Sequence, residues 1–213
     1  MQAQDLLRSM VDYYASMRSY SDHGNVDARS QRRDRVTSTQ FSTLYQKPSF
    51  FRFAFVRPHP HTPLNQAVTQ HVIGFDGSNA YQIFKRYSGD VEVKSIDKLE
   101  SALAGASGIS NGAAHTLAQL LLPGIGGISF LELRNIRFND DVTVDGAPCY
   151  TVAAEHPTGD SHFELHIERE CLLLRPSMWE TEAFRFDESR MNIRVNEPIE
   201  SALFAAALRD LAA

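Results

Sequence analysis

Along most of this chain, apolar and polar side chains alternate over short segments, and this alternation constrains the fold more than any other feature. Phe51, Phe53 and Phe55 fall on one side of such a segment, as they would on a strand, where successive side chains point to opposite faces. Asp76-Gly77 and Asp145-Gly146 separate neighbouring segments, and Asp-Gly is a signal for a tight turn. Short consecutive strands joined by tight turns predict an antiparallel sheet with one buried and one solvated face.

The same pattern places the expected strands along the sequence. A polar stretch over 19–34 reads as a turn or a ragged strand, and the three prolines of 57–65 predict a loop. The first clear strand begins at Val36 and is broken by Pro48. The other expected strands cover 50–56, 67–75, 79–87, 91–96, 130–138, 141–144, 149–154, 161–168, 171–175, 181–186 and 191–195.

Three regions instead have the pattern of helices. Residues 4–18 place their apolar side chains on one helical face. Residues 97–127 contain two expected helices, 97–104 and 110–122, and the second has an apolar stripe of Leu117, Leu120 and Leu121. The Ala/Leu-rich tail predicts a C-terminal helix over 199–212. The helices do not alternate with the strands, so we expect a single α+β domain over 1–213 rather than a parallel sheet.

Composition excludes several classes of protein. The 213 residues carry 21 basic and 26 acidic side chains, a net charge of −5, whereas a nucleic-acid-binding protein usually has a basic excess. No apolar run approaches the ~20 residues of a membrane span. The first residues show no secretory leader. The chain is therefore expected to be either a periplasmic protein whose leader has been removed or a cytoplasmic protein.

Two motifs resemble the LolA/LolB-like lipoprotein carrier superfamily of bacterial envelopes. The first is Lys47-Pro48-Ser49-Phe50-Phe51-Arg52-Phe53, a basic-Pro-x-x-aromatic-basic-aromatic strand, and the second is the hairpin Gly74-Phe75-Asp76-Gly77-Ser78-Asn79-Ala80-Tyr81. The end of the first helix, Met17-Arg18-Ser19-Tyr20, is also similar, and so is Val195-Asn196-Glu197-Pro198-Ile199, which resembles uncharacterised secreted relatives. The resemblance covers most of the chain in order.

The resemblance implies a strongly bent antiparallel sheet of about 11 strands, an unclosed β-barrel, covered by a few lid helices. In the carriers the apolar concave face takes acyl chains of lipoproteins, and an Arg just before the motif proline ties the lid shut. Lys47 holds that position here. The resemblance therefore makes Lys47 the candidate lid latch, although Lys lacks the planar five-donor fork of Arg and does not offer the same multi-point contact.

Apolar residues at every second position are candidates to face the hollow of such a sheet. They either fill it as an ordinary core or leave an apolar cavity for a lipid tail, because only apolar surface gains by entering a hollow of this kind. The candidates are Phe51, Phe53, Phe55, Ile73, Phe75, Tyr81, Ile83, Phe163, Leu165, Ile167, Phe184 and Phe186.

Other groups that could carry chemistry receive simpler interpretations. His162, Glu164 and His166 alternate on one strand face beside His156, and they indicate a solvated face rather than a zinc site, because no third ligand is evident. The spacing of His59 and His61 in the proline loop is undefined. We expect Cys149 and Cys171 to lie on either side of one strand, about 9.5 Å apart, as free and inert thiols.

No catalytic or cofactor motif is present in a suitable context: there is no G-x-S-x-G, H-E-x-x-H, Walker loop or G-x-G-x-x-G. A small basic run is expected either to be a solvated strand edge or to dock an acidic partner; its members are Arg29, Arg32, Arg33 and Arg35.

The sequence therefore predicts a non-catalytic periplasmic protein without metal or cofactor, which holds a lipid, acyl chain or lipoprotein in an apolar concave sheet. The alternative is an envelope-stress regulatory domain of the same fold, which would sense lipoproteins through a protein partner.

Overall fold

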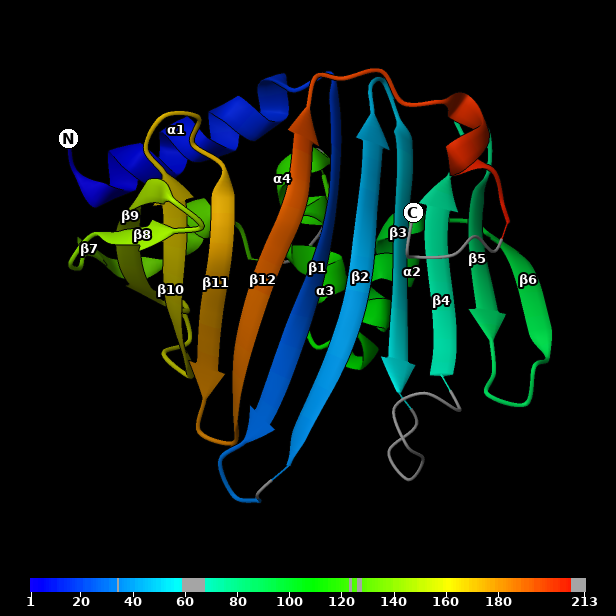
Figure 1. Ribbon diagram of the computed structural model, residues 1–213, viewed down its shortest axis with the longest axis horizontal. Coiled ribbons are helices and arrows are strands. Elements are labelled where there is room, and N and C mark those ends of the chain that lie inside the picture. Colours follow the sequence, from blue (N-terminus) through cyan, green and yellow to red (C-terminus); the bar gives the residue numbers. More distant parts are fainter. Residues whose placement is uncertain (34, 59–67, 123, 126–127, 208–213) are drawn as a thin grey trace.

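A computed structural model describes residues 1–33, 35–58, 68–122, 124–125 and 128–207. Within this part of the chain the strands form one twelve-stranded antiparallel sheet in the order β6-β5-β4-β3-β2-β1-β12-β11-β10-β9-β7, and β8 pairs with β9 (Figure 1). Neighbours in the sequence are mostly neighbours in the sheet, as tight turns require. Among the strands described, two pairings join strands that do not follow one another in the sequence: β1 with β12 at the centre of the sheet, and β7 with β9 at one end.

Many of the strand bounds lie close to the alternating segments. Those of the first half are β1 Ser19–Ser30, β2 Val36–Gln46, β3 Phe50–Pro58, β4 Val68–Phe75, β5 Ala80–Lys85 and β6 Val91–Ile96. Those of the second half are β7 Arg134–Phe138, β8 Val142–Val144, β9 Ala147–Glu155, β10 Ser161–Glu168, β11 Leu174–Thr181 and β12 Phe184–Val195. The expected antiparallel class is confirmed.

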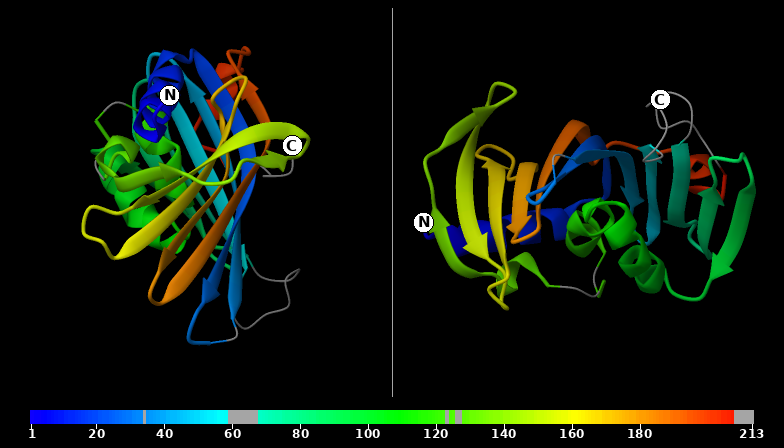
Figure 2. Two further views of the ribbon diagram at one scale, coloured as in Figure 1. Left: turned by 90° about the vertical axis from the view of Figure 1, so that its left-hand side faces the viewer. Right: turned by 90° about the horizontal axis from the view of Figure 1, so that it is seen from below.

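Helices occupy the hollow of the sheet. Among the described residues they are α1 Ala3–Ser16, α2 Leu99–Ile109, α3 Ala113–Thr116 and α4 Ala118–Leu121, with the short 3-10 helices η1 Phe130–Glu132 and η2 Ser201–Phe204. Seen from below, the sheet curves around α2, α3 and α4, whereas η2 lies on the opposite face (Figure 2). The architecture is therefore an unclosed, bent sheet that carries helices on its concave side, as expected.

One hydrophobic core joins the concave face to the helices. Phe41, Phe53 and Phe55 of the sheet belong to the same buried cluster as Leu103 of α2 and Leu117. The helix α1 adds a buried stripe to that cluster through Leu6, Leu7, Met10 and Tyr14. The alternation of β3 supplies this arrangement, because its odd-numbered phenylalanines all point into the hollow.

The C-terminal segment differs from the expected helix over 199–212. Between residues 199 and 207 only η2 is helical. Residues 208–212 lie outside the described residues. Phe204 is fully buried and packs on Phe50 at a ring-centroid distance of 5.3 Å. Tyr81 also donates a hydrogen bond to the Phe204 carbonyl oxygen, at 2.7 Å. These contacts anchor the segment on the convex face as a short 3-10 helix.

Several other expected boundaries need correction. The polar stretch 19–34 contains β1, a central strand, because its polar side chains find partners inside the fold. The strands expected over 171–175 and 181–186 are instead β11 and the start of β12, which turn at 182–183. The expected 130–138 strand begins only at Arg134, after η1.

The lid also differs in detail from its expected form. The helix α2 continues to Ile109, and the second expected helix is divided into α3 and α4 at Leu117. The proline loop of the sequence analysis is described only up to Pro58, so His59 and His61 lie outside the described residues.

Gly24 provides a test of this packing. A Cβ on Gly24 would overlap the ring of Phe41 and the Ser189 carbonyl oxygen. We expect Gly24→Ala to lower the free energy of unfolding by ~1–3 kcal/mol, the usual cost of overpacking. Gly105 lies in α2 with open space around it, so Gly105→Ala should raise that free energy by up to ~1 kcal/mol. Urea denaturation of both variants measures the two values, and equal effects would contradict the packing described.

Candidate functional site

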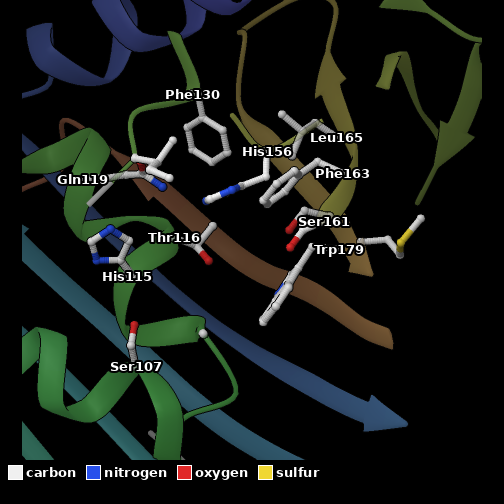
Figure 3. Close-up of a pocket in the computed structure, with 14 residues that line it drawn as sticks. Ser107, His115, Thr116, Gln119, Phe130, His156, Ser161, Phe163, Leu165 and Trp179 are labelled. Carbon is white, nitrogen blue, oxygen red and sulfur yellow. The ribbon is translucent and has the colours of Figure 1, made fainter. Parts of the chain in front are cut away.

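A cavity of about 400 Å³ lies between the lid helices and strands β10 and β11. Figure 3 shows side chains of the lid on one side of it and side chains of the strands on the other. Several lining residues are half-buried, among them Phe163 and Trp179, so the cavity communicates with solvent. The described lining residues are Ser107, Gly112, His115, Thr116, Gln119, Ile128, Phe130, His156, Ser161, Phe163, Leu165, Ser177, Met178 and Trp179.

The strand side of the cavity is apolar and rigidly packed. Phe163 and Trp179 are paired across β10 and β11, and Leu165 follows on the same face. Trp179 stacks on Phe186 with ring centroids 3.7 Å apart and an interplanar angle of 7°. A Cβ on Gly112 of the lid would stand 3.0 Å from the Trp179 ring. Trp179 therefore fills the space between the sheet and the lid at one end of the cavity.

The lid side is polar. His115 and Gln119 are four residues apart over α3 and α4, a spacing that places side chains on the same helical face. His115 Nε2 and Gln119 Oε1 are buried without a hydrogen-bond partner among the described residues. Burial lowers the pKa of the His115 imidazole, because desolvation disfavours the charged form. His156, from the β9–β10 connection, points toward Gln119 across the cavity (Figure 3).

A charged cluster is buried behind Thr116, where β1 meets β12. Arg190 Nη1 lies 2.5 Å from Asp22 Oδ2, and its Nη2 donates to Glu188. Thr116 donates to the second Glu188 oxygen at 2.9 Å, and Tyr20 donates to Asp22 at 2.9 Å. Desolvation raises the pKa of Glu188 above its usual range, partly offset by Arg190. With both carboxylates ionised, two negative charges face one positive charge.

The predicted hollow residues lie in several different surroundings. Phe163 and Leu165 line the cavity. Phe51, Phe53, Phe55 and Ile73 are fully or almost fully buried on the concave face, in the core that also contains Leu117, Leu120 and Leu121, so the lid helices already fill this part of the hollow. Ile167 belongs to the same core, and Phe75 is half-buried beside Phe51. The last group consists of Phe184, 44% exposed, with its neighbour Phe186 packed on Trp179.

For Tyr81 and Ile83 the expectation of a concave position is wrong. Both belong to a separate buried cluster with Ala54 and Val72, on the other face of the sheet. The register explains this placement, because Ile83 pairs with Val72 and Val72 with Ala54, one residue out of phase with Phe53 and Ile73. A one-residue change of phase moves a side chain to the opposite face.

Lys47 makes a latch, but to a different helix from the one expected. Its Nζ donates to the Ala15 carbonyl oxygen at 2.7 Å. Ala15 lies in the last turn of α1, outside the 97–127 lid. A lysine suits that place, since a cation near the C-terminus of a helix satisfies free carbonyl groups and interacts favourably with the helix dipole. Lys47 therefore fastens α1 to the β2–β3 turn.

Sequence reasoning missed the residues that define the cavity, namely Trp179, His115 and Gln119. Trp179 is the only tryptophan of the chain and falls between two expected strands. A single strand predicted across this interval would have placed Trp179 opposite Phe163. That pairing was the signal in the sequence that could have located the cavity. His115 and Gln119 lie at i and i+4 on the polar side of the leucine stripe, a pattern that is common on solvated helix faces.

The remaining histidines and the cysteines have ordinary surroundings. His162, Glu164 and His166 alternate on the face of β10 opposite Leu165, and no group of three potential metal ligands occurs among the residues described. Both cysteines are free. Cys149 pairs with Glu168 as expected, but Cys171 lies in the β10–β11 connection rather than in a strand. Burial raises the pKa of both thiols, which disfavours the reactive thiolate.

The basic run lies away from the sheet edges, contrary to expectation, because β1 and β2 are central strands. Arg29 pairs with Asp187 at 3.6 Å, and Arg32 pairs with Glu182 at 3.0 Å. Arg32, Arg33 and Arg35 line a second cavity of about 510 Å³ that also includes Phe184.

The fold, an open antiparallel sheet that holds helices in its hollow, is shared with several solved structures. LprF from Mycobacterium bovis is similar over 93% of this chain and 94% of its own, with a TM-score of 0.53 and 13% identity. An uncharacterized conserved protein from Thermus thermophilus is similar over 97% of this chain and 95% of its own, with a TM-score of 0.53 and 9% identity. The LolA superfamily protein NE2245 from Nitrosomonas europaea covers 96% of this chain and 98% of its own at a TM-score of 0.36 and 7% identity.

No protein-family model matches the sequence, and no curated protein matches it. The likeness to solved structures concerns the fold, and it agrees with the bent antiparallel sheet expected from the sequence. None of the helices in the described part of the chain has the length and apolar character needed to cross a membrane.

The buried cluster predicts a large effect for the loss of its cation. Arg190→Met would leave two buried carboxylates without a counter-charge, so we expect the free energy of unfolding to fall by about 3–5 kcal/mol. Arg194 lies on the same strand in an exposed pair with Glu197, and Arg194→Met should change it by less than ~1 kcal/mol. Urea denaturation at neutral pH compares the two variants. A loss at position 190 no larger than that at 194 would contradict the account.

His71 predicts a pH dependence. It lies on the concave face between Phe55 and Phe84, with ring centroids 4.6 and 4.3 Å away. Burial lowers the pKa of His71 to about 4, so the unfolded chain binds this proton more readily. The contribution of neutral His71 to stability is therefore lost as the pH falls from about 6.5 through about 4.

We expect His71→Phe to flatten this acid decline, because phenylalanine fits the same stack and does not titrate. The exposed variant His162→Phe should retain it. Thermal unfolding at several pH values between 7 and 4 measures the difference, and parallel curves for wild type and His71→Phe would contradict the prediction.

Proposed function

We propose that this chain is a non-catalytic binding module of the bacterial cell envelope, which holds an apolar chain of a lipid or lipoprotein under its helical lid. The observation that carries the proposal is the cavity of about 400 Å³ between the lid and β10–β11. Its volume falls at the small end of the ~300–1,000 Å³ range of ligand pockets. Its strand side is made of Phe163, Leu165 and Trp179, which offer an acyl chain an apolar surface.

The energetics suit reversible holding. Each buried methylene group contributes about 0.8 kcal/mol, so ten groups contribute about 8 kcal/mol before the cost of association is subtracted. A ligand of this length would therefore bind with moderate affinity. That behaviour favours a carrier that releases its cargo over a storage protein.

Location in the envelope is part of the proposal and is supported by the LolA-like fold together with the sequence motifs around Lys47 and Asp76. A protein of this kind would bind its ligand at a membrane surface or receive it from a partner. The proposed activity needs neither a nucleophile nor a cofactor.

The regulatory alternative is favoured by one feature, the second cavity beside Phe184. Arg33 and Arg35 form no ion pair with another described residue, and they stand next to an exposed phenylalanine. An acidic protein segment with an apolar side chain would fit this surface. A regulator would bind such a partner through the Arg-rich cavity, whereas a carrier would exchange lipid with vesicles.

A pair of serines on α2 tests the proposed function. Ser107 lines the cavity, and Ser101 is exposed on the same helix. Methyl decanoate should change the emission of Trp179, the single tryptophan, in a saturable manner. Ser107→Phe would occupy the cavity and should weaken binding at least ~10-fold, since it displaces buried chain length, while Ser101→Phe should bind like the wild type.

Mass spectrometry of gently extracted protein provides a second measurement, because a carrier should retain an apolar ligand. The proposal is wrong if no lipid is retained and methyl decanoate gives no saturable change. It is also wrong if Ser107→Phe and Ser101→Phe bind equally well.

A further inference from the structure

Two side chains of the lid that line the cavity each carry a buried polar atom without a partner among the described residues. Gln119 Oε1 and His115 Nε2 are buried and accept or donate no hydrogen bond among the described residues, and both side chains line the cavity. Their four-residue spacing places them on one face of the lid. Buried polar groups in folded proteins nearly always have a partner, because an unpaired one carries the full cost of desolvation. A ligand in the cavity would therefore gain affinity here if a rotation of the two side chains brought these atoms into hydrogen-bond contact with it.

The character of these atoms limits the group that they can bind. Gln119 Oε1 is an acceptor and requires a hydrogen-bond donor. His115 is kept neutral by burial at physiological pH, as the lowered pKa indicates, so its Nε2 is either donor or acceptor and carries no positive charge. A hydroxyl group, which both donates and accepts, satisfies the two positions together.

The surrounding charges disfavour an anionic ligand. None of the lining residues that the structure describes is Lys, Arg, Asp or Glu. Directly behind Thr116 lies the cluster of Asp22, Glu188 and Arg190, in which two carboxyl groups face one guanidinium group. His156 also lines the cavity, but its Nδ1 already contacts Asp160 at 3.1 Å. A carboxylate in the cavity would lose its water, find no Lys or Arg among the described lining residues and face the buried cluster, and a buried unpaired charge is costly.

We propose that the cavity selects a single acyl chain whose polar end is uncharged and carries a hydroxyl group, as in a monoacylglycerol. Gln119 Oε1 accepts a hydrogen bond from that hydroxyl, and His115 Nε2 contacts the same head group. The inference rests on the proposed function, because it names the ligand class of the same cavity.

Three ten-carbon ligands test the selectivity on the wild-type protein. They are 1-monodecanoylglycerol, methyl decanoate, which is uncharged but has no donor, and decanoate, which is ionised at pH 8. Titration followed by Trp179 emission should give the tightest binding for the monoacylglycerol. We expect it to bind roughly 3- to 10-fold more tightly than methyl decanoate, the size of a single hydrogen bond, and decanoate should bind most weakly.

Substitution of Gln119 then assigns the effect to the lid. Gln119→Met keeps the length of the side chain and removes the acceptor, so the preference for the monoacylglycerol over methyl decanoate, measured as the ratio of the two dissociation constants in the same variant, should disappear. Gln40→Met, at an exposed position on β2, is the matched control and should retain the preference. The comparison of ligands on the wild type does not depend on how well either variant folds.

The outcomes separate the two proposals. Equal binding of all three ligands, tighter binding of decanoate, or a preference that survives in Gln119→Met would overturn the inference and leave the proposed function in place. If none of the three ligands binds, the proposed function fails as well. If the preference for the monoacylglycerol is lost in Gln119→Met and kept in Gln40→Met, the result supports both the proposed function and the inference about the ligand class.

Discussion

The buried cluster of Arg190, Asp22 and Glu188 is the interaction on which the arrangement of the molecule depends. It joins β1 and β12, the first and last strands in the sequence, which are neighbours at the centre of the sheet. Through Thr116 it also contacts the lid. Charges removed from water need partners in fixed positions, because each unpaired group costs several kcal/mol. The cluster therefore sets how β1, β12 and α3 lie together. The apolar core around it tolerates changes of shape better, provided that its total volume is kept.

The lid divides the concave face into two unequal parts. Over β2–β4 its leucines and alanines pack directly on the phenylalanines of the sheet and leave a solid core. Over β10–β11 Gly112 of the lid lies against the Trp179 ring, and the cavity lies beside this contact. The position of the candidate site thus follows from where the lid meets Trp179, rather than from the phenylalanine-rich strand β3.

Sequence reasoning found most of the sheet because the alternation of β3 and β10 records which side of a strand is buried. It failed at β1, where Asp22 and Asn25 form polar contacts inside the fold that composition alone assigns to a loop. The candidate site was predicted only through Phe163 and Leu165. The cavity exists because the lid and the strands do not pack together completely at this place. No local sequence pattern gives the distance between Gln119 and Trp179. The phase of Tyr81 and Ile83 likewise depends on strand register, which the turn at Asp76-Gly77 did not fix in advance.

Strands β6 and β7 end the sheet without pairing to each other among the described residues. In a closed barrel, strand number and stagger determine the internal diameter. Here that constraint is absent, because a change in curvature that spreads the two flanks would break no interstrand hydrogen bond. We therefore expect the interior of the proposed binding module to adapt to apolar chains of different width while the pairing of the strands stays unchanged.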